Sequence, residues 1–211
     1  MYYYHCQKKK FSSQKMDKEE LFQIKSNTLE VNPGDVLLSE PFLLDMYFSR
    51  AVVLIMDHNE EDGTCGIIIN KRIPVTINDV VDGFPMFDAD VYIGGPVKND
   101  NVFFTHTLGN MVPESTEICK GLYWSNNFNV IKSLIRCGLV TRFDIRFFLG
   151  YCGWDAGQLR DELRRNSWIV GKMSTKAITM TNPKVMWETF TKATGKQYQL
   201  WSKFPLNPND N

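Results

Sequence analysis

The sequence predicts an α+β fold built on a mixed β-sheet, and three observations support this prediction. Short apolar runs rich in Val, Ile and Phe have the length of buried strands. They alternate irregularly with helix-like segments, unlike the regular alternation of a doubly wound parallel sheet. Several neighbouring runs are separated by short turns, which is typical of hairpins. The chain has 211 residues, of which 43% are hydrophobic, and this length suits one large domain.

The predicted strands are the apolar segments that turn residues delimit. The Pro33-Gly34 turn precedes the first, and a polar turn at 57–63 joins the second and third. A turn at Gly94-Gly95-Pro96 separates another pair. The predicted strands cover residues 36–38, 51–56, 65–70, 91–93, 102–106, 121–124, 145–149 and 168–170.

We expect the strand side chains to form one continuous core. The runs are too short for helices and too apolar for surface strands. The side chains that should share this core are Val52, Leu54, Ile67, Ile69, Ile93, Phe147 and Leu149.

Capping residues predict four helices. Thr76 and Asp79 have capping-box spacing, which predicts a short helix through Val81. Asn127 can cap a helix that ends at Cys137. A third helix is predicted over residues 155–165, with Asp155 and Gln158 as its capping box. Asn182-Pro183 predicts the start of a fourth helix, which ends at Gly195.

Composition limits the class of protein. Twenty-four basic residues balance 24 acidic ones, which argues against a protein that coats nucleic acid or anionic membrane. The longest pure apolar run, residues 51–56, is too short to span a membrane. Five cysteines without C-x-x-C spacing predict reduced thiols in the cytoplasm, and neither a zinc site nor a disulfide framework.

The polar ends of the chain are predicted to lie outside the folded domain. Residues 1–25 have no apolar period and no apolar stretch of a secretory signal, so we expect a disordered tail. Residues 205–211 should be frayed. A single domain is therefore expected over residues 26–204.

The most distinctive segment joins a predicted strand to a predicted helix. Gly150, Gly153 and Gly157 surround Trp154 within eight residues. Such spacing predicts a backbone that approaches another part of the chain closely. We expect the Trp154 ring to be buried against a distant turn, with Gly94-Gly95-Pro96 as the first candidate.

These landmarks resemble the AlgH/YqgE family of bacterial proteins. The resemblance runs from about Val31 to about Gly195. Its motifs are Pro33-Gly34, 48–54, Asp57-His58, 66–70, 92–97, His106, 150–154, Gly157-Gln158-Leu159, Glu162, Ser167-Trp168 and Trp187. The resemblance implies a bifurcated mixed sheet curled into a pseudo-barrel, with helices packed outside. Members are often labelled transcriptional regulators, and no activity, substrate or cofactor is established for the family.

Three positions depart from the family pattern. Asp57 stands where the family commonly has Glu, Cys152 where it has Ala, and Asp155 where it has a small residue. The first change keeps a carboxylate, whereas the other two weaken any role specific to those side chains.

The candidate binding residues each have a structural alternative. The backbone N–H groups of Gly94 and Gly95 could hold an anion, but a tight turn explains these glycines equally well. His106 could bind or catalyse, yet no carboxylate at metal-ligand spacing accompanies it, and a satisfied buried histidine is preferred.

A second candidate pocket lies at the start of the third predicted helix. Gln158 and Glu162 are four residues apart and share a helix face. With Tyr151 and Trp154 they are the best candidate pocket lining in the sequence, although packing roles are favoured. A basic patch could be formed by Arg160, Arg164 and Arg165 with Arg136, Arg142 and Arg146. No DNA-reading motif accompanies these arginines, and a solvated helix face paired with Asp161 and Glu162 is the preferred interpretation.

The sequence predicts a non-enzymatic regulatory or binding protein. The alternative is a small-molecule-binding enzyme that uses polar groups around Gly153–Glu162 together with His106. No nucleophile with an adjacent base and no paired acid and base is visible. We expect no metal, no cofactor and no membrane association, and we regard specific DNA binding as doubtful. The partner, a protein or a small molecule, stays open.

Overall fold

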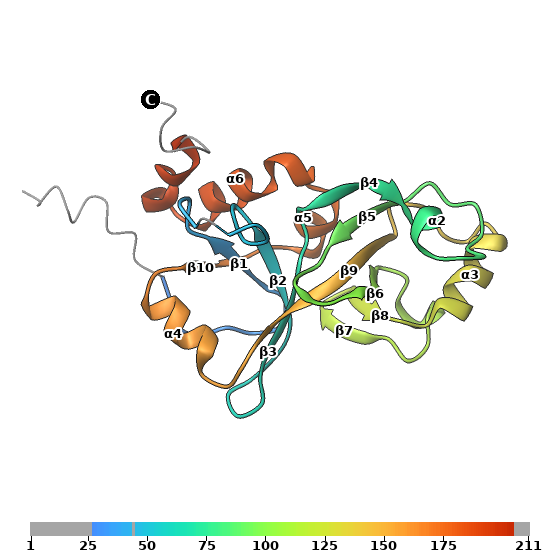
Figure 1. Ribbon diagram of the computed structural model, residues 1–211, viewed down its shortest axis with the longest axis horizontal. Helices are drawn as coiled ribbons and strands as arrows, with labels where there is room; N and C mark the ends of the chain where they lie inside the picture. Colours follow the sequence, from blue (N-terminus) through green and yellow to red (C-terminus); the bar gives the residue numbers. More distant parts are fainter. Residues whose placement is uncertain (1–26, 44, 205–211) are drawn as a thin grey trace, which may run out of the picture.

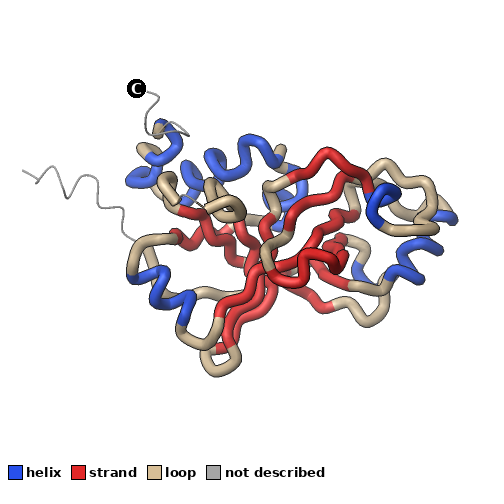
Figure 2. The backbone as a smooth tube through the Cα atoms, viewed as in Figure 1, coloured by secondary structure: helices blue, strands red, loops and turns tan. Residues whose placement is uncertain are grey.

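The computed structural model describes residues 27–43 and 45–204, and both predicted tails, 1–25 and 205–211, lie outside the described residues. The described chain is a mixed α+β structure in which strands occupy the centre and helices lie outside, as predicted (Figure 1; Figure 2). The strands are β1 (Asp35–Ser39), β2 (Val52–Asn59), β3 (Gly63–Ile68), β4 (Arg72–Thr76), β5 (Asp90–Ile93), β6 (Val97–His106), β7 (Thr116–Cys119), β8 (Leu122–Ser125), β9 (Ile145–Trp154) and β10 (Trp168–Lys172).

Strand β9 connects the two parts of the sheet and runs through the middle of the molecule (Figure 1). The strands follow the order β10-β1-β2-β3-β9-β6-β8-β7, and β4 and β5 form a branch. The C-terminal part of β9 pairs antiparallel with β3, whereas its N-terminal part pairs in parallel with β5. Strand β6 pairs with β9 on the opposite edge. The sheet is therefore mixed and branched.

The predicted closure into a pseudo-barrel is not confirmed. The path of paired strands ends at β10 on one side and at β7 on the other, and no pairing between these two strands occurs within the described residues. Because β9 divides one edge between β3 and β5, the sheet forks at this strand. Its two parts extend away from each other, and the pairing is that of an open sheet.

Helices cover the outer faces of the sheet (Figure 2). Packing against three separate clusters holds them there. The α-helices are α2 (Ile77–Val80), α3 (Phe128–Arg136), α4 (Gln158–Arg164), α5 (Thr175–Met180) and α6 (Pro183–Thr194). Short 3₁₀ turns are η1 (Gly109–Met111), η2 (Lys196–Tyr198) and η3 (Trp201–Lys203).

Three of the four predicted helix starts are confirmed. The Asp79 carboxylate accepts hydrogen bonds from the Thr76 N–H and hydroxyl, both at 2.7 Å. Asn127 accepts from the N–H of Val130, and Asn182 caps α6 by accepting from the N–H of Lys184 at 3.0 Å. Each cap satisfies a backbone donor that the first helical turn leaves free.

The predicted start of the third helix is wrong by three residues. Helix α4 begins at Gln158, and Gly157, with φ of 79°, occupies its N-cap. The Gln158 side chain does reach back and accepts from the N–H of Asp155 at 3.0 Å, but the Asp155 carboxylate does not cap the helix. Helix α5, whose N-cap is Ser174, was not predicted because its six residues carry little apolar periodicity.

The expectation of one continuous core is wrong. Val52, Leu54, Ile67 and Ile69 lie in one cluster beneath α6, together with Trp187. Phe147 lies in another cluster beneath α3, Leu149 packs at its edge, and Ile93 is only half-buried. A third cluster lies beneath α4. Strand side chains alternate between the two faces of a sheet, and helices cover both faces here, so the apolar residues divide between separate layers.

The glycine-rich segment continues β9 and does not end it. Gly150 has φ of 68°, which only glycine adopts without strain. A Cβ at this position would lie 2.5 Å from the carbonyl oxygen of Gly95. The predicted close approach is therefore real, and it joins β9 to the turn at Gly94-Gly95-Pro96.

Candidate functional site

The described chain contains an open cleft of about 1010 Å³. Its walls come from segments far apart in the sequence. They are residues 70–74, 88–90 and 92–93 around β4 and β5, 105–107 at the end of β6, Leu122 on β8, 142–146 at the start of β9, and 179–184 between α5 and α6. A concave site of this size is where small-molecule ligands usually bind.

Arg146 is a half-buried cation of the cleft. Its guanidinium donates to the carbonyl oxygens of Ile178 at 3.3 Å and Thr179 at 2.6 Å, and it lies 5.4 Å above the ring of Tyr92. Burial lowers the pKa of Arg146, whereas Tyr92 and the charge of Asp90 act in the opposite direction. Arg146 makes no ion pair with any residue that the structure describes. It therefore joins the end of α5 to the sheet while its charge remains without a close counterion.

Lys71 is a second cation in the wall. Its ammonium donates to the carbonyl oxygen of Ser49. Burial lowers the pKa of Lys71, and the nearby charge of Arg50 lowers it further. Arg50 itself lies 4.9 Å above the Trp187 ring, and its Nε is buried without a hydrogen-bond partner within the described chain. Two partly desolvated cations thus act on each other beside the cleft.

The other charges of the cleft are largely paired. Arg72 contacts Asp90 at 2.9 Å, and Arg142 contacts Asp88 at 3.1 Å. Both pairs are exposed, so each adds little stability. The two pairs neutralise carboxylates that would otherwise be available as counterions for the remaining cations of the wall.

His106 is the one predicted site residue that lines the cleft. It is 1% exposed, and Nδ1 accepts from the N–H of Leu108 at 3.3 Å. Nε2 lies 2.8 Å from the hydroxyl of Ser115, which in turn donates to the carbonyl oxygen of Val112. This network assigns the proton to Nε2. Burial lowers the pKa of His106 to about 4, so the ring is neutral at pH 7.

Gly94 and Gly95 pack against β9. The N–H of Gly94 donates to Leu149 at 2.7 Å, and its carbonyl oxygen accepts from Ile68 at 2.7 Å. A Cβ at Gly95 would overlap the backbone of Tyr151. The geometry explains both glycines by close backbone approach, and the N–H of Gly94 is already used within the sheet.

Trp154, Gln158 and Glu162 lie together, as predicted, but outside the large cleft. Glu162 accepts from the indole N–H of Trp154 at 2.9 Å and from that of Trp168 at 2.7 Å. It also accepts from the Gln158 amide at 3.0 Å. The Trp154 ring is buried, as expected, but its partners are Trp168 and Phe48 and not the Gly94-Gly95-Pro96 turn.

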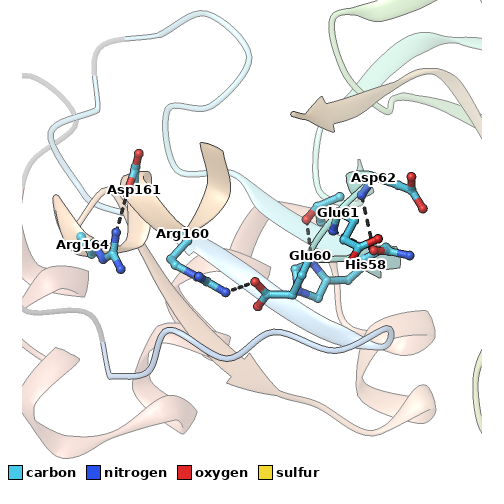
Figure 3. A network of polar contacts seen from close by, with 9 residues as sticks. His58, Glu60, Glu61, Asp62, Arg160, Asp161 and Arg164 are labelled. Atoms are coloured by element: carbon cyan, nitrogen blue, oxygen red, sulfur yellow. Dashed lines mark hydrogen bonds and ion pairs between the residues drawn. The ribbon is translucent and has the colours of Figure 1, made fainter. Parts of the chain in front are cut away.

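The outer face of α4 carries paired charges (Figure 3). Arg160 reaches across to Glu60 at the turn between β2 and β3, and Arg164 contacts Asp161 at 3.0 Å. A small hollow of about 20 Å³ lies beside this face, which is too little for a ligand. The arginines of α4 are therefore a solvated, charge-balanced face, as the sequence interpretation prefers.

Tyr151 and Cys152 take positions on opposite faces of β9. The Tyr151 ring packs edge-on against Phe103, with centroids 6.1 Å apart. The Cys152 thiol is 1% exposed and donates to the carbonyl oxygen of Gly94 at 3.3 Å. Burial raises its pKa, so this thiol is unreactive. The binding roles predicted for Gly94, Gly95, His106, Tyr151, Trp154, Gln158 and Glu162 stay predictions.

Sequence reasoning missed Lys71 and the threonines of the cleft, and it grouped Arg142 and Arg146 only with the arginines of α4 as a possible basic patch. Lys71, Arg146 and the segment 179–184 come from regions that no motif connects. A basic residue in the otherwise apolar strand around Arg146 was the one available signal. Across the described ranges, no group of three or more His, Cys, Asp or Glu side chains has metal-site geometry. Within the same ranges, no helix has the length and apolarity of a membrane span.

The fold and the cleft define an α+β protein with a branched mixed sheet. Comparison with known proteins identifies this class more closely. A model of the AlgH-like family matches residues 36–199, so the chain belongs to the AlgH-like family. UPF0301 proteins of Bacteroides thetaiotaomicron and Bacteroides fragilis are 41% and 40% identical, over 91% of this chain and 97% of theirs.

Solved structures of bacterial proteins share the fold. The solution structure of the AlgH protein from Pseudomonas aeruginosa has a TM-score of 0.65 at 26% identity and covers 82% of this chain and 94% of that one. A crystal structure of a Corynebacterium diphtheriae protein has a TM-score of 0.70 at 23% identity and covers 83% of this chain and 93% of that one. The second likeness concerns the fold alone.

Proposed function

We propose that this protein is a non-enzymatic regulatory binding protein whose small-molecule ligand occupies the cleft between β4–β5, the start of β9 and the α5–α6 segment. The observation that carries the proposal is the cleft of about 1010 Å³, whose walls come from segments far apart in the sequence. Its size reaches the upper end of the range of roughly 300–1000 Å³ that is usual for ligand pockets.

The chemistry of the wall supports binding more than catalysis. No serine or cysteine is among the described residues that line the cleft. Both ring nitrogens of His106 are engaged within the protein, and its lowered pKa of about 4 removes it from the range useful to a general base at pH 7. Asp88 and Asp90 are held in ion pairs with arginines.

The enzymatic alternative requires His106 to act with the polar groups of Gly153–Glu162. His106 lines the large cleft, and none of the residues 153–162 does. Glu162 is committed to three hydrogen bonds, two of them from buried indoles. This separation favours the binding protein over the enzyme.

Regulation by this protein would act through its ligand or a partner protein and not through direct reading of DNA. The balanced overall charge and the neutralised arginines of α4 support this part of the proposal. A cytoplasmic location is part of the same proposal. Its support is that the cysteines in the described ranges, Cys65, Cys119, Cys137 and Cys152, are all free thiols.

A nuclear magnetic resonance titration with a fragment library tests the proposal. The account predicts that bound fragments shift the backbone amides of residues 71–73, 90–93 and 179–184. Shifts confined to Trp154, Gln158 and Glu162 would support the alternative site. Fragments that bind elsewhere or nowhere would refute the proposal.

A further inference from the structure

We propose that the ligand of the cleft is an amphipathic anion: a small molecule whose carboxylate or phosphate group lies in the field of Lys71 and Arg146, and whose apolar body packs on Phe143 and Met180. This inference rests on the proposed function, because it specifies the ligand of the same cleft. Charge balance, desolvation and exposed apolar surface support it independently.

The charge of the cleft is positive. Its wall holds five basic side chains and three carboxylates, which leaves two net positive charges because His106 is neutral. Two of the carboxylates form the ion pairs Arg72–Asp90 and Arg142–Asp88. The third, Asp144, accepts from the N–H of Thr141 at 2.8 Å and from its hydroxyl at 2.6 Å. The cations of the wall without an ion pair are Lys71, Arg146 and Lys184, and together with Asp144 they account for the two net positive charges.

Two of these cations are partly removed from water. Arg146 is held by carbonyl oxygens of α5, and Lys71 by that of Ser49. The negative charge of Asp90, on β5, raises the pKa of Arg146, but Asp90 is already in an ion pair with Arg72 at 2.9 Å. Desolvating a charge without a counterion is costly. An anionic group in the cleft would supply the missing counterion, and this is the reason for assigning negative charge to the ligand.

Large apolar side chains are exposed at the same cleft. Phe143 is 64% exposed and Met180 is 59% exposed, and both line the cavity. The guanidinium of Arg142 lies over one face of the Phe143 ring, 5.2 Å from its centroid. An apolar body would cover both side chains and remove their surface from water. A bare inorganic anion would leave this surface uncovered, so the geometry points to a ligand that is both charged and apolar.

Calorimetric titration with three matched probes tests the inference. 2-Naphthoate and 2-naphthyl phosphate carry the anionic group on an aromatic body, and 2-naphthamide is the neutral counterpart. Both anions should bind at least about tenfold more tightly than the amide, and this advantage should shrink as salt is added. The ratio between the two anions then shows whether the cleft prefers a carboxylate or a phosphate.

Charge-removing variants assign the effect to the cleft. Lys71→Met should reduce the affinity for both anions at least about fivefold and leave the affinity for the amide nearly unchanged. Lys176→Met makes the same change at an exposed position of α5 outside the cleft, and it should alter neither. Because Arg146→Met removes the bonds to α5, it is interpreted only with a melting curve that shows a folded protein.

Three results would overturn the inference. The first is equal affinity for anions and amide, which would leave the proposed binding function intact. The second is an equal loss of anion binding in Lys71→Met and Lys176→Met. The third is no binding of any probe; the fragment titration then decides separately whether the cleft binds neutral molecules.

Discussion

Replacing Glu162 by alanine should destabilise the protein although Glu162 is only half-buried. Its carboxylate is the shared acceptor for the indole N–H groups of Trp154 and Trp168, at 2.9 and 2.7 Å. These rings are 6% and 2% exposed. Alanine would leave two donors without their partner and remove this polar link between α4 and the sheet, whereas Leu159 and Leu163 would still pack α4 on the core.

The size of the effect follows from the number of bonds lost. A buried donor without a partner costs about 1–3 kcal/mol. Two such donors would cost up to about 6 kcal/mol, and water entering beside the half-exposed Glu162 should reduce this to about 3 kcal/mol. For a chain of this length that loss lowers the melting temperature by roughly 6–12 °C. Glu162→Gln keeps one oxygen for the indoles and should cost only about 1 kcal/mol.

Urea unfolding followed by tryptophan fluorescence measures both variants. Asp161→Ala on the same helix is the matched control, because its exposed pair with Arg164 should contribute less than about 1 kcal/mol. If Glu162→Ala unfolds at the same urea concentration as the parent, the carboxylate does not hold the two indoles. A parent-like midpoint combined with loss of a ligand would instead make Glu162 a binding residue.

Three further predictions concern His106, Trp154 and DNA. Since the pKa of His106 is lowered from its ordinary 6.5 to about 4, the unfolded chain takes up the proton first. The contribution of neutral His106 to the free energy of unfolding should be fully present above pH 6.5 and should fall by up to about 3 kcal/mol as the pH drops to 4. His106→Gln should flatten this part of the plot of urea midpoint against pH. An unchanged plot would contradict the lowered pKa of His106. Trp154→Ala should cost about 3–5 kcal/mol, whereas a variant that melts like the parent but loses a ligand would identify the ring as a binding platform. In gel shifts near physiological salt the protein should bind duplex DNA weakly and without preference; about thousandfold discrimination between sequences would disprove this.

Sequence reasoning was most successful where a local signal determines the structure. Apolar runs located the central strands, and short polar side chains such as Asn127 and Asn182 located helix starts, because a cap acts within one helical turn. The glycines around Trp154 correctly indicated a close backbone approach. These features depend on neighbours in the sequence and on backbone sterics.

The sequence failed where distant segments meet. The cleft depends on the branch at β9, which brings residues 70–74, 88–93 and 179–184 together although no periodicity connects them. Helix α5 is too short to carry an apolar period. The partner of the Trp154 ring was misassigned because the indole turns towards Trp168 and Glu162. The glycine turn instead packs against the backbone of β9 and accepts a hydrogen bond from the Cys152 thiol.

A crystal structure of the protein soaked with a fragment library is the measurement that tests the central claim most directly. The account predicts that fragments are seen in the cleft between β4–β5, the start of β9 and the α5–α6 segment, with anionic groups directed at Arg146 and Lys71. Fragments that gather instead beside Trp154 and α4, with the cleft empty in the same crystals, would contradict it.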